Sequence, residues 1–195
     1  MSPLNIYLCG VGGQGIGLLS EVLGQACLAA GHVVRGCDTH GLAQRGGTVV
    51  SHVRLGAHAF APRVPPGRAD LVIGLERIEA LRATLEMLQP GGAVLYYDTV
   101  HQPASVRTRE AKEPSADDLA HAVAERNGRV ERVFLDDLPD PRSQNVALLG
   151  CLGAVGLVEG VGLAQIEQAL RDTLPAAALE ANLGVLAAGA GGARR

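Results

Sequence analysis

The chain has 195 residues and a formal net charge of −3. This length fits one domain with a full-sized core, and the near-neutral charge, without a basic tract, argues against a nucleic-acid partner. The chain has no apolar run of transmembrane length and no N-terminal signal pattern, so we expect a cytoplasmic protein without membrane contact.

The core is expected to consist of aliphatic residues, because hydrophobic residues make up 47% of the chain and aromatic residues only 3%. Such cores are typical of parallel sheets covered by helices. The four cysteines contain no CxxC pair and no spacing for zinc or iron–sulfur ligands. We interpret them as buried thiols of a reducing compartment and assign no metal site to the chain.

Strands and helices alternate along the sequence. Residues 4–9 predict a buried strand, followed by a glycine-rich loop and a helix that ends at Gly31. Residues 32–37 predict a second strand, which completes a βαβ unit with parallel strands and a right-handed crossover. The later elements are expected as a strand at 48–55, a strand at 69–75, a helix at 76–88 stopped by residues 89–92, a strand at 93–97, a helix from Ser115 to 126, a strand at 130–135 and helices at 144–159, 163–174 and 176–187.

This alternation predicts an α/β fold: an open, doubly wound, Rossmann-like and mostly parallel sheet with C-terminal helices. The sequence contains no internal repeat and no composition change that would mark a second domain. We therefore expect residues 1–188 to form a single domain and residues 189–195 to form a disordered tail.

The first glycine-rich loop holds five glycines within residues 10–17. The spacing of Gly10, Gly12 and Gly15 matches the dinucleotide-binding fingerprint, in which a pyrophosphate meets the start of the following helix. Asp38, near the end of the second strand, would then bind the ribose. A lone fingerprint is weak evidence, and the loop after Asp38 would crowd an adenosine. A structural or partner-facing role for these glycines is therefore the preferred interpretation.

A second polar, glycine-rich loop follows the second strand, at the sheet edge where ligand crevices form in open α/β sheets. Arg45 in this loop could reach a phosphate or a carboxylate. Ser51 is interpreted as a strand serine near the crevice, and Asn145 is expected to bond backbone at a helix start. The residues assigned to ligand-facing or partner-facing positions are Gly10, Gly12, Gly13, Gln14, Gly15, His40, Gln44, Arg45, Gly46, Gly47 and Ser51.

Two histidines, His40 and His52, are candidates for acid–base chemistry. The sequence places no carboxylate to orient either of them, and no serine or cysteine signature marks a nucleophile. We therefore assign no catalytic residue to this chain.

Taken together, residues 10–16 and 40–56 resemble the gamma-type domain of 2-oxoacid:ferredoxin oxidoreductases, and within that family most of all the beta subunit of the indolepyruvate enzymes. The resemblance covers about the whole chain. It continues through residues 65–70, the helix at Glu76, residues 89–92 and the segment of Asn145 with residues 148–150.

The resemblance implies a subunit that works in a hetero-oligomer and is not active alone. Such enzymes decarboxylate a 2-oxoacid, here indolepyruvate or another aryl pyruvate, and pass electrons to ferredoxin or a similar acceptor while an acyl group goes to coenzyme A. The resemblance places thiamine pyrophosphate, Mg²⁺ and [4Fe-4S] clusters in the large partner subunit, so this chain is expected to bind no cofactor by itself. The glycine-rich edge would face coenzyme A, the substrate or partner side chains.

Two other functions remain open from the residues alone. The chain could be a free-standing Rossmann-type NAD(P) dehydrogenase, with Asp38 on a ribose and His40 or His52 as the catalytic group. It could also be a structural module whose glycine-rich edge only docks another protein.

Overall fold

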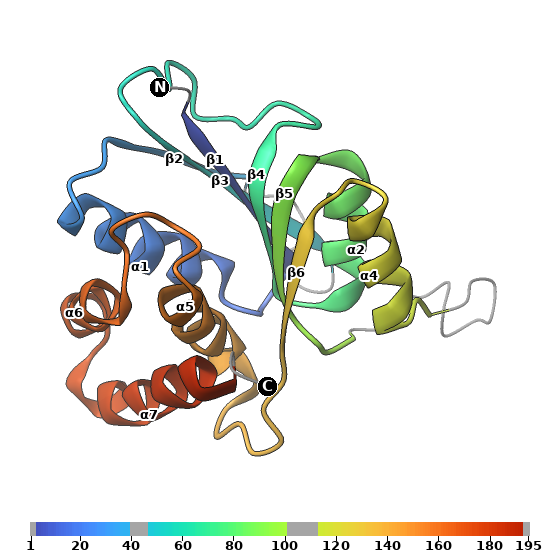
Figure 1. Cartoon of the computed structure of the whole chain (residues 1–195). Coiled ribbons are helices and arrows are strands. Elements are labelled where there is room, and N and C mark those ends of the chain that lie inside the picture. The colour runs from blue at the N-terminus through green and yellow to red at the C-terminus, as the bar shows by residue number, and fades with distance from the viewer. Residues whose placement is uncertain (1–2, 40–46, 101–112, 193–195) are drawn as a thin grey trace.

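A computed structural model describes residues 3–39, 47–100 and 113–192 (Figure 1). Within these ranges six strands form one sheet in the order β2-β3-β1-β4-β5-β6. The strands are β1 (Leu4–Val11), β2 (Val34–Thr39), β3 (Thr48–Leu55), β4 (Ala69–Gly74), β5 (Leu88–Tyr97) and β6 (Arg129–Val133). The helices are α1 (Ile16–Ala29), α2 (Arg77–Glu86), α4 (Ala116–Ala124), the 3₁₀ turn η1 (Pro141–Ser143), α5 (Gln144–Val155), α6 (Leu163–Thr173) and α7 (Ala176–Gly192).

The strand directions confirm an α/β fold with a mostly parallel sheet. β1, β4, β5 and β6 are parallel neighbours, whereas β3 runs antiparallel to both β1 and β2. β1 and β2 run parallel, as expected for the first βαβ unit, but they are not neighbours, because β3 lies between them. β3 is an eight-residue strand rich in β-branched residues and pairs with β1 along its whole length, from Leu4↔Leu55 to Val11↔Thr48. The six-residue β2 takes the edge position instead.

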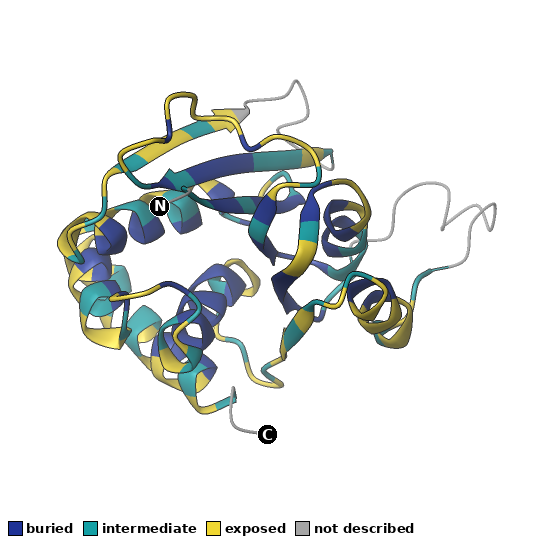
Figure 2. Ribbon diagram, turned by 45° about the horizontal axis from the view of Figure 1, so that its top comes forward, coloured by how far each residue is buried: buried dark blue, intermediate teal, exposed yellow. Residues whose placement is uncertain are grey.

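Helices cover both faces of the sheet, as the doubly wound prediction requires (Figure 1). α1, α5, α6 and α7 contribute to one hydrophobic core, which contains Leu8, Leu23 and Leu148, all fully buried. α2 and α4 enclose a smaller core on the other face, around Val72 and Leu119. Figure 2 shows that the buried residues run along the central strands and the inner faces of these helices.

α5 and α7 cross at backbone contact. A Cβ atom at Gly150 would lie 2.1 Å from the Leu186 carbonyl oxygen, and one at Gly189 would lie 2.1 Å from the Ala147 carbonyl oxygen. Residues 189–192 were expected in a disordered tail, but the structure places them in α7, because Gly189 packs directly on α5. The predicted end of this helix at residue 187 is therefore too early.

Residues 89–92 follow α2 as expected, yet they belong to β5 and do not form a loop. The register between β4 and β5 shifts between Ala69↔Leu88 and Leu71↔Ala93, and the Gly91 amide donates to the Arg126 carbonyl at 2.8 Å. The stretch is thus an irregular start to the strand. Among the described helices, none combines the length and the apolar character needed to cross a membrane.

Candidate functional site

The first glycine-rich loop and Gly47, the last residue of the second, lie at the edge of the sheet where the parallel strands end, the lower edge in Figure 1. β1 leads there into the first loop, and β3 begins there directly after the second. The Gly12 amide donates to the Gly47 carbonyl oxygen at 2.9 Å. We call this surface, formed by residues 12–15 and 47–48, the glycine edge.

Gln14 points into the protein and holds the first loop together. Gln14 is only 5% exposed. Its Oε1 accepts from the Val11 amide at 2.7 Å, and its Nε2 donates to the Leu75 carbonyl at 3.2 Å. A Cβ atom at Gly10 would lie 2.8 Å from Gln14 Oε1. Gly10 and Gln14 were assigned to ligand-facing positions, but here both serve the internal packing of the loop.

Gly15 joins α1 to α5. Its φ of +82° lies in the left-handed region that favours glycine, and a Cβ atom there would lie 2.5 Å from Asn145 Nδ2. This Asn145 nitrogen donates to the Gly15 carbonyl at 3.1 Å, and its Oδ1 accepts from the Val146 amide at 2.7 Å. The expected role of Asn145, bonding backbone at a helix start, is confirmed. The third glycine of the fingerprint thus makes room for a helix contact.

The geometry does not support a dinucleotide site on this loop. β3 separates β2 from β1, so Asp38 stands two strand spacings, about 10 Å, from Leu8 on β1 and is not on the strand next to the one that leads into the glycine loop. Asp38 also accepts a hydrogen bond from the fully buried Ser51 hydroxyl, which lies 2.9 Å from Ser20 Oγ. The amide of Gly12, which would meet a pyrophosphate, is already bonded to Gly47.

His52 is a buried structural histidine. It is 4% exposed, its ring stands edge-on to Tyr7 with centroids 5.1 Å apart, and its Nδ1 accepts from the Val64 amide at 3.1 Å. Burial, helped by the charge of Arg63, lowers the pKa of His52 below that of a free histidine. The neutral ring therefore serves packing, and it does not face the glycine edge.

Four of the assigned residues, His40, Gln44, Arg45 and Gly46, lie outside the described residues. Of the others, Gly13 is exposed, has φ +101° and has open space where a Cβ atom would stand. The partly exposed Gly12 and Gly47 lie beside it along the glycine edge.

Sequence reasoning missed a charged group close to this edge. Asp98, directly after β5, has a side chain that is 1% exposed and pairs with Arg77 (Nη2–Oδ1 2.5 Å) and with Arg132. Arg77 also donates to the Pro114 carbonyl at 3.1 Å. In the sequence, Asp98 could be recognised only as a carboxylate at the end of a predicted strand. Its partners Arg77 and Arg132 come from α2 and β6, which are distant in the sequence.

A second missed group ties α2 to the start of β3. Arg82 Nη1 donates to Thr48 Oγ1 at 2.9 Å and pairs with Glu79 at 3.1 Å. Burial raises the pKa of Glu79, and Arg82 opposes that shift. Burial likewise raises the pKa of the Cys9 thiol well above its usual range, so Cys9 stays protonated and is a poor nucleophile.

The known proteins that the chain resembles place this arrangement in a family. The model of the pyruvate ferredoxin/flavodoxin oxidoreductase family matches residues 5–191. The chain belongs to this family. The indolepyruvate oxidoreductase subunit IorB of Archaeoglobus fulgidus is 34% identical to this oxidoreductase chain over 190 residues, which are 95% of the chain and 93% of the relative. The IorB subunit of Thermococcus kodakarensis is 32% identical over 94% of the chain and 92% of its own length.

Solved structures share the fold of this oxidoreductase family member. The gamma subunit of a keto/oxoacid ferredoxin oxidoreductase from Geobacter sulfurreducens superposes with a TM-score of 0.66 at 20% identity, over 97% of this chain and 98% of that one. The 2-oxoglutarate:ferredoxin oxidoreductase of Magnetococcus marinus gives a TM-score of 0.69 at 20% identity, and it covers 100% of this chain and 31% of its own. At this identity the match establishes the fold alone.

The cysteines of this oxidoreductase chain do not fit an iron–sulfur cluster. Cys9, Cys27 and Cys151 are buried and Cys37 is half-buried, and all four thiols are free. Across residues 3–39, 47–100 and 113–192, no three His, Cys, Asp or Glu side chains gather in a way that could hold a metal ion.

Proposed function

We propose that the chain is the small subunit of a thiamine-dependent 2-oxoacid:ferredoxin oxidoreductase that converts indolepyruvate or another aryl pyruvate to an acyl-CoA. The observation that carries the proposal is the similarity to IorB subunits, which extends over 94–97% of this chain and 92–97% of theirs.

The chain works in the cytoplasm as part of a hetero-oligomer with a large subunit. Oxidative decarboxylation needs an electron sink for the substrate carbanion and a route for two electrons, which thiamine pyrophosphate with Mg²⁺ and [4Fe-4S] clusters supply when bound. We assign these groups to the large subunit, because the cysteines of this chain occur singly in the sequence.

The glycine edge is the part of this chain that meets the large subunit. The first loop is closed by its own hydrogen bonds through Gln14, so it presents a preformed backbone surface. Gly13 leaves that surface free of side chains, and another protein can approach closely. We assign Arg45 to binding the coenzyme A phosphates, the substrate carboxylate or the partner's side chains, because a guanidinium pairs well with such groups.

Activity of the co-expressed complex tests this proposal. Reduction of methyl viologen should require the chain, the large subunit, coenzyme A and an aryl 2-oxoacid, and either subunit alone should be inactive. Arg45→Ala should lower kcat/KM, whereas Arg171→Ala, at an exposed surface ion pair on α6, should leave it unchanged. Full activity of the large subunit alone would contradict the proposal.

Calorimetry separates this proposal from a free-standing dehydrogenase. The purified chain should give no binding heat with NAD(H) or NADP(H), because Asp38 is tied to Ser51 and the Gly12 amide to Gly47. Tight binding that Asp38→Ala abolishes would favour the dehydrogenase instead.

A further inference from the structure

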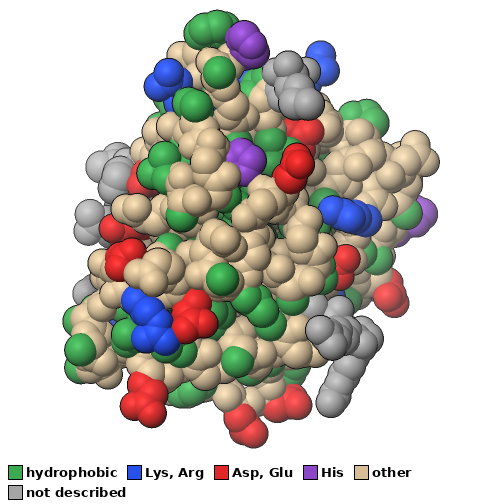
Figure 3. Space-filling model, turned by 60° about the vertical axis from the view of Figure 1, so that its left-hand side comes forward, with side chains coloured by type: hydrophobic (Ala, Val, Ile, Leu, Met, Phe, Trp, Pro, Cys, Tyr) green, Lys and Arg blue, Asp and Glu red, His purple; other side chains and the backbone are tan. Residues whose placement is uncertain are grey.

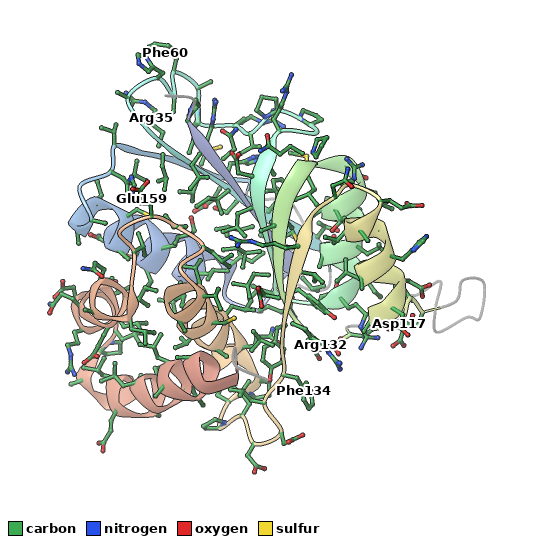
Figure 4. All side chains as sticks on the ribbon, in the orientation of Figure 1. Arg35, Phe60, Asp117, Arg132, Phe134 and Glu159 are labelled. Atoms are coloured by element: carbon green, nitrogen blue, oxygen red, sulfur yellow. The ribbon has the colours of Figure 1, made fainter. Side chains whose placement is uncertain are left out.

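The strand β2 forms one outer edge of the sheet, and no described strand pairs with its outer side. Figure 4 labels Arg35 of this strand at the upper left. The Gly56 amide donates to the Val33 carbonyl at 2.8 Å, which continues the β2–β3 ladder by one pair. Because hydrogen-bonded residues alternate in an antiparallel ladder, residues 34, 36 and 38 direct their backbone N–H and C=O groups away from β3. β2 therefore presents a row of donors and acceptors to which a further strand can add.

A groove of about 270 Å³ lies between this edge and α1. Its lining includes Gly24 and Leu28 of α1, Val34 and Gly36 of β2, and Val53 of β3. Leu28 is 55% exposed although its side chain is large and apolar. Directly opposed residues of paired strands point to the same face of a sheet. The side chains that an added strand places opposite Val34 and Gly36 would therefore enter this groove.

Two glycines keep the groove open. Gly24 lies in the interior of α1, where a glycine costs about 1 kcal/mol relative to alanine. A Cβ atom at Gly24 would meet no described atom within 4 Å outside its own helix, and one at Gly36 would meet the His52 carbonyl oxygen at 3.6 Å, an ordinary contact. Packing among the described residues thus requires a glycine at neither position. The missing side chains leave room for side chains that come from outside the chain.

The two ends of the groove differ in charge. Glu21 and Asp38 lie where α1 begins and β2 ends, at the end nearer the glycine edge, and both are exposed. Asp38 accepts from the Ser51 hydroxyl, but neither carboxylate forms an ion pair with another described residue. Acidic side chains are also spread over the α1 side of the molecule (Figure 3). The other end, with Leu28 and Val34, is apolar.

We propose that β2 and the groove bind an extended segment of a partner protein as an added antiparallel strand. The segment carries a basic residue opposite Asp38. Two and four positions later it carries apolar residues, which oppose Gly36 and Val34. Backbone hydrogen bonds along the edge supply affinity, and the groove and its acidic end select the side chains. This inference does not rest on the proposed function, because it uses only the sheet edge and α1.

A second copy of this chain fits the edge poorly. In a two-fold antiparallel pairing of β2 with itself, opposed residues must share a face of the sheet. The two registers that pair most of the strand place Asp38 of one copy opposite Val34 or Gly36 of the other. Either register would put a carboxylate into the groove, where its lining is apolar or already acidic. A basic and apolar segment of another protein avoids this conflict.

Fluorescence anisotropy with a labelled peptide tests the proposal on the full chain. The probe is the peptide Thr-Arg-Thr-Leu-Thr-Val-Thr with fluorescein at its N-terminus, and we expect saturable binding with a Kd on the order of 100 μM or lower. Gly24→Leu fills the groove and favours the helix, so it should raise the Kd at least about tenfold without loss of helical signal in circular dichroism. Gly184→Leu on α7, where the space for a side chain is also open, is the matched control and should leave the Kd unchanged.

Two further measurements identify strand addition by the backbone. A peptide that is N-methylated at its leucine, the residue opposite Gly36, lacks one donor to the edge and should bind the wild-type chain at least about tenfold more weakly. Bound peptide should slow the hydrogen exchange of the amides of Val34, Gly36 and Asp38 in NMR spectra. Glu21→Lys should weaken binding about two- to fivefold, and a peptide with Glu in place of Arg should bind this variant better than the wild-type chain.

Several results would overturn the proposal. They are no saturable binding to the wild-type chain up to about 1 mM peptide, an unchanged Kd for Gly24→Leu, an equal loss in Gly184→Leu, or equal binding of the methylated peptide. A dimer in light scattering that Gly24→Leu dissociates would make a second copy the occupant and would also contradict the proposal. The methylated peptide acts on the wild-type chain, so this comparison decides the matter even if Gly24→Leu fails to fold.

Discussion

Gln14→Ala tests whether the glycine loop is held by the chain itself. The substitution removes the acceptor of the Val11 amide and the donor to the Leu75 carbonyl, at 2.7 and 3.2 Å. A buried polar group that loses its partner costs about 1–3 kcal/mol. Val11 is partly exposed, so water can replace one of the two contacts. One buried group, the Leu75 carbonyl, is then left without its partner, so we expect a loss of about 1–3 kcal/mol in the free energy of unfolding.

Urea unfolding followed by far-UV circular dichroism measures this loss. For a chain of this length the expected change lowers Tm by about 2–12 °C. Gln25→Ala is the matched control, because Gln25 is an exposed glutamine on α1, and it should change stability by less than about 0.5 kcal/mol.

The opposite pattern would refute the reasoning. If Gln14→Ala left the free energy of unfolding unchanged but abolished assembly with the large subunit, the side chain would be a partner contact. The internal hydrogen bonds would then contribute little to the loop.

Three further predictions concern the packing and charges around the site. Gly150→Ala should lower the free energy of unfolding, measured in urea, by at least about 2 kcal/mol, because the new Cβ atom would lie 2.1 Å from the Leu186 carbonyl oxygen. Gly184→Ala, where the space for a Cβ atom is open, should raise it by up to about 1 kcal/mol. Asp98→Asn should lower stability by about 2–4 kcal/mol, since two arginines share that buried carboxylate, and an unchanged Tm in scanning calorimetry would contradict this. The pKa of His52 is lowered in the folded protein. The stabilisation from the neutral, buried ring is therefore complete above the ordinary histidine pKa of 6.5, and it is lost as the pH falls below that value. His52→Gln should make the unfolding free energy less dependent on pH between about 5 and 7.5.

Local patterns predicted the class of fold well. Alternating apolar runs and helical spacing gave the α/β architecture, and the helix predicted from Ser115 is α4, which Ser115 caps together with Asp118. The rule that such loops gather at one sheet edge placed Gly12 and Gly47 at the same edge, and the bond between them agrees with it.

Long-range partners explain what the sequence did not reveal. The residue pattern of β3 predicts a strand but not its position. Its antiparallel place between β1 and β2 depends on pairing across the whole sheet. Gln14 turns inward toward Leu75, 61 residues away. The helical state of residues 189–192 likewise depends on a contact between Gly189 and Ala147 that no local pattern encodes.

A titration tests the central claim most directly. Increasing amounts of this chain are added to a fixed amount of the large subunit, with an aryl 2-oxoacid, coenzyme A and methyl viologen present. The account predicts that activity rises from near zero and saturates at a fixed subunit ratio. A rate that is already maximal without this chain, or one that the chain produces alone with NAD(P), would contradict it.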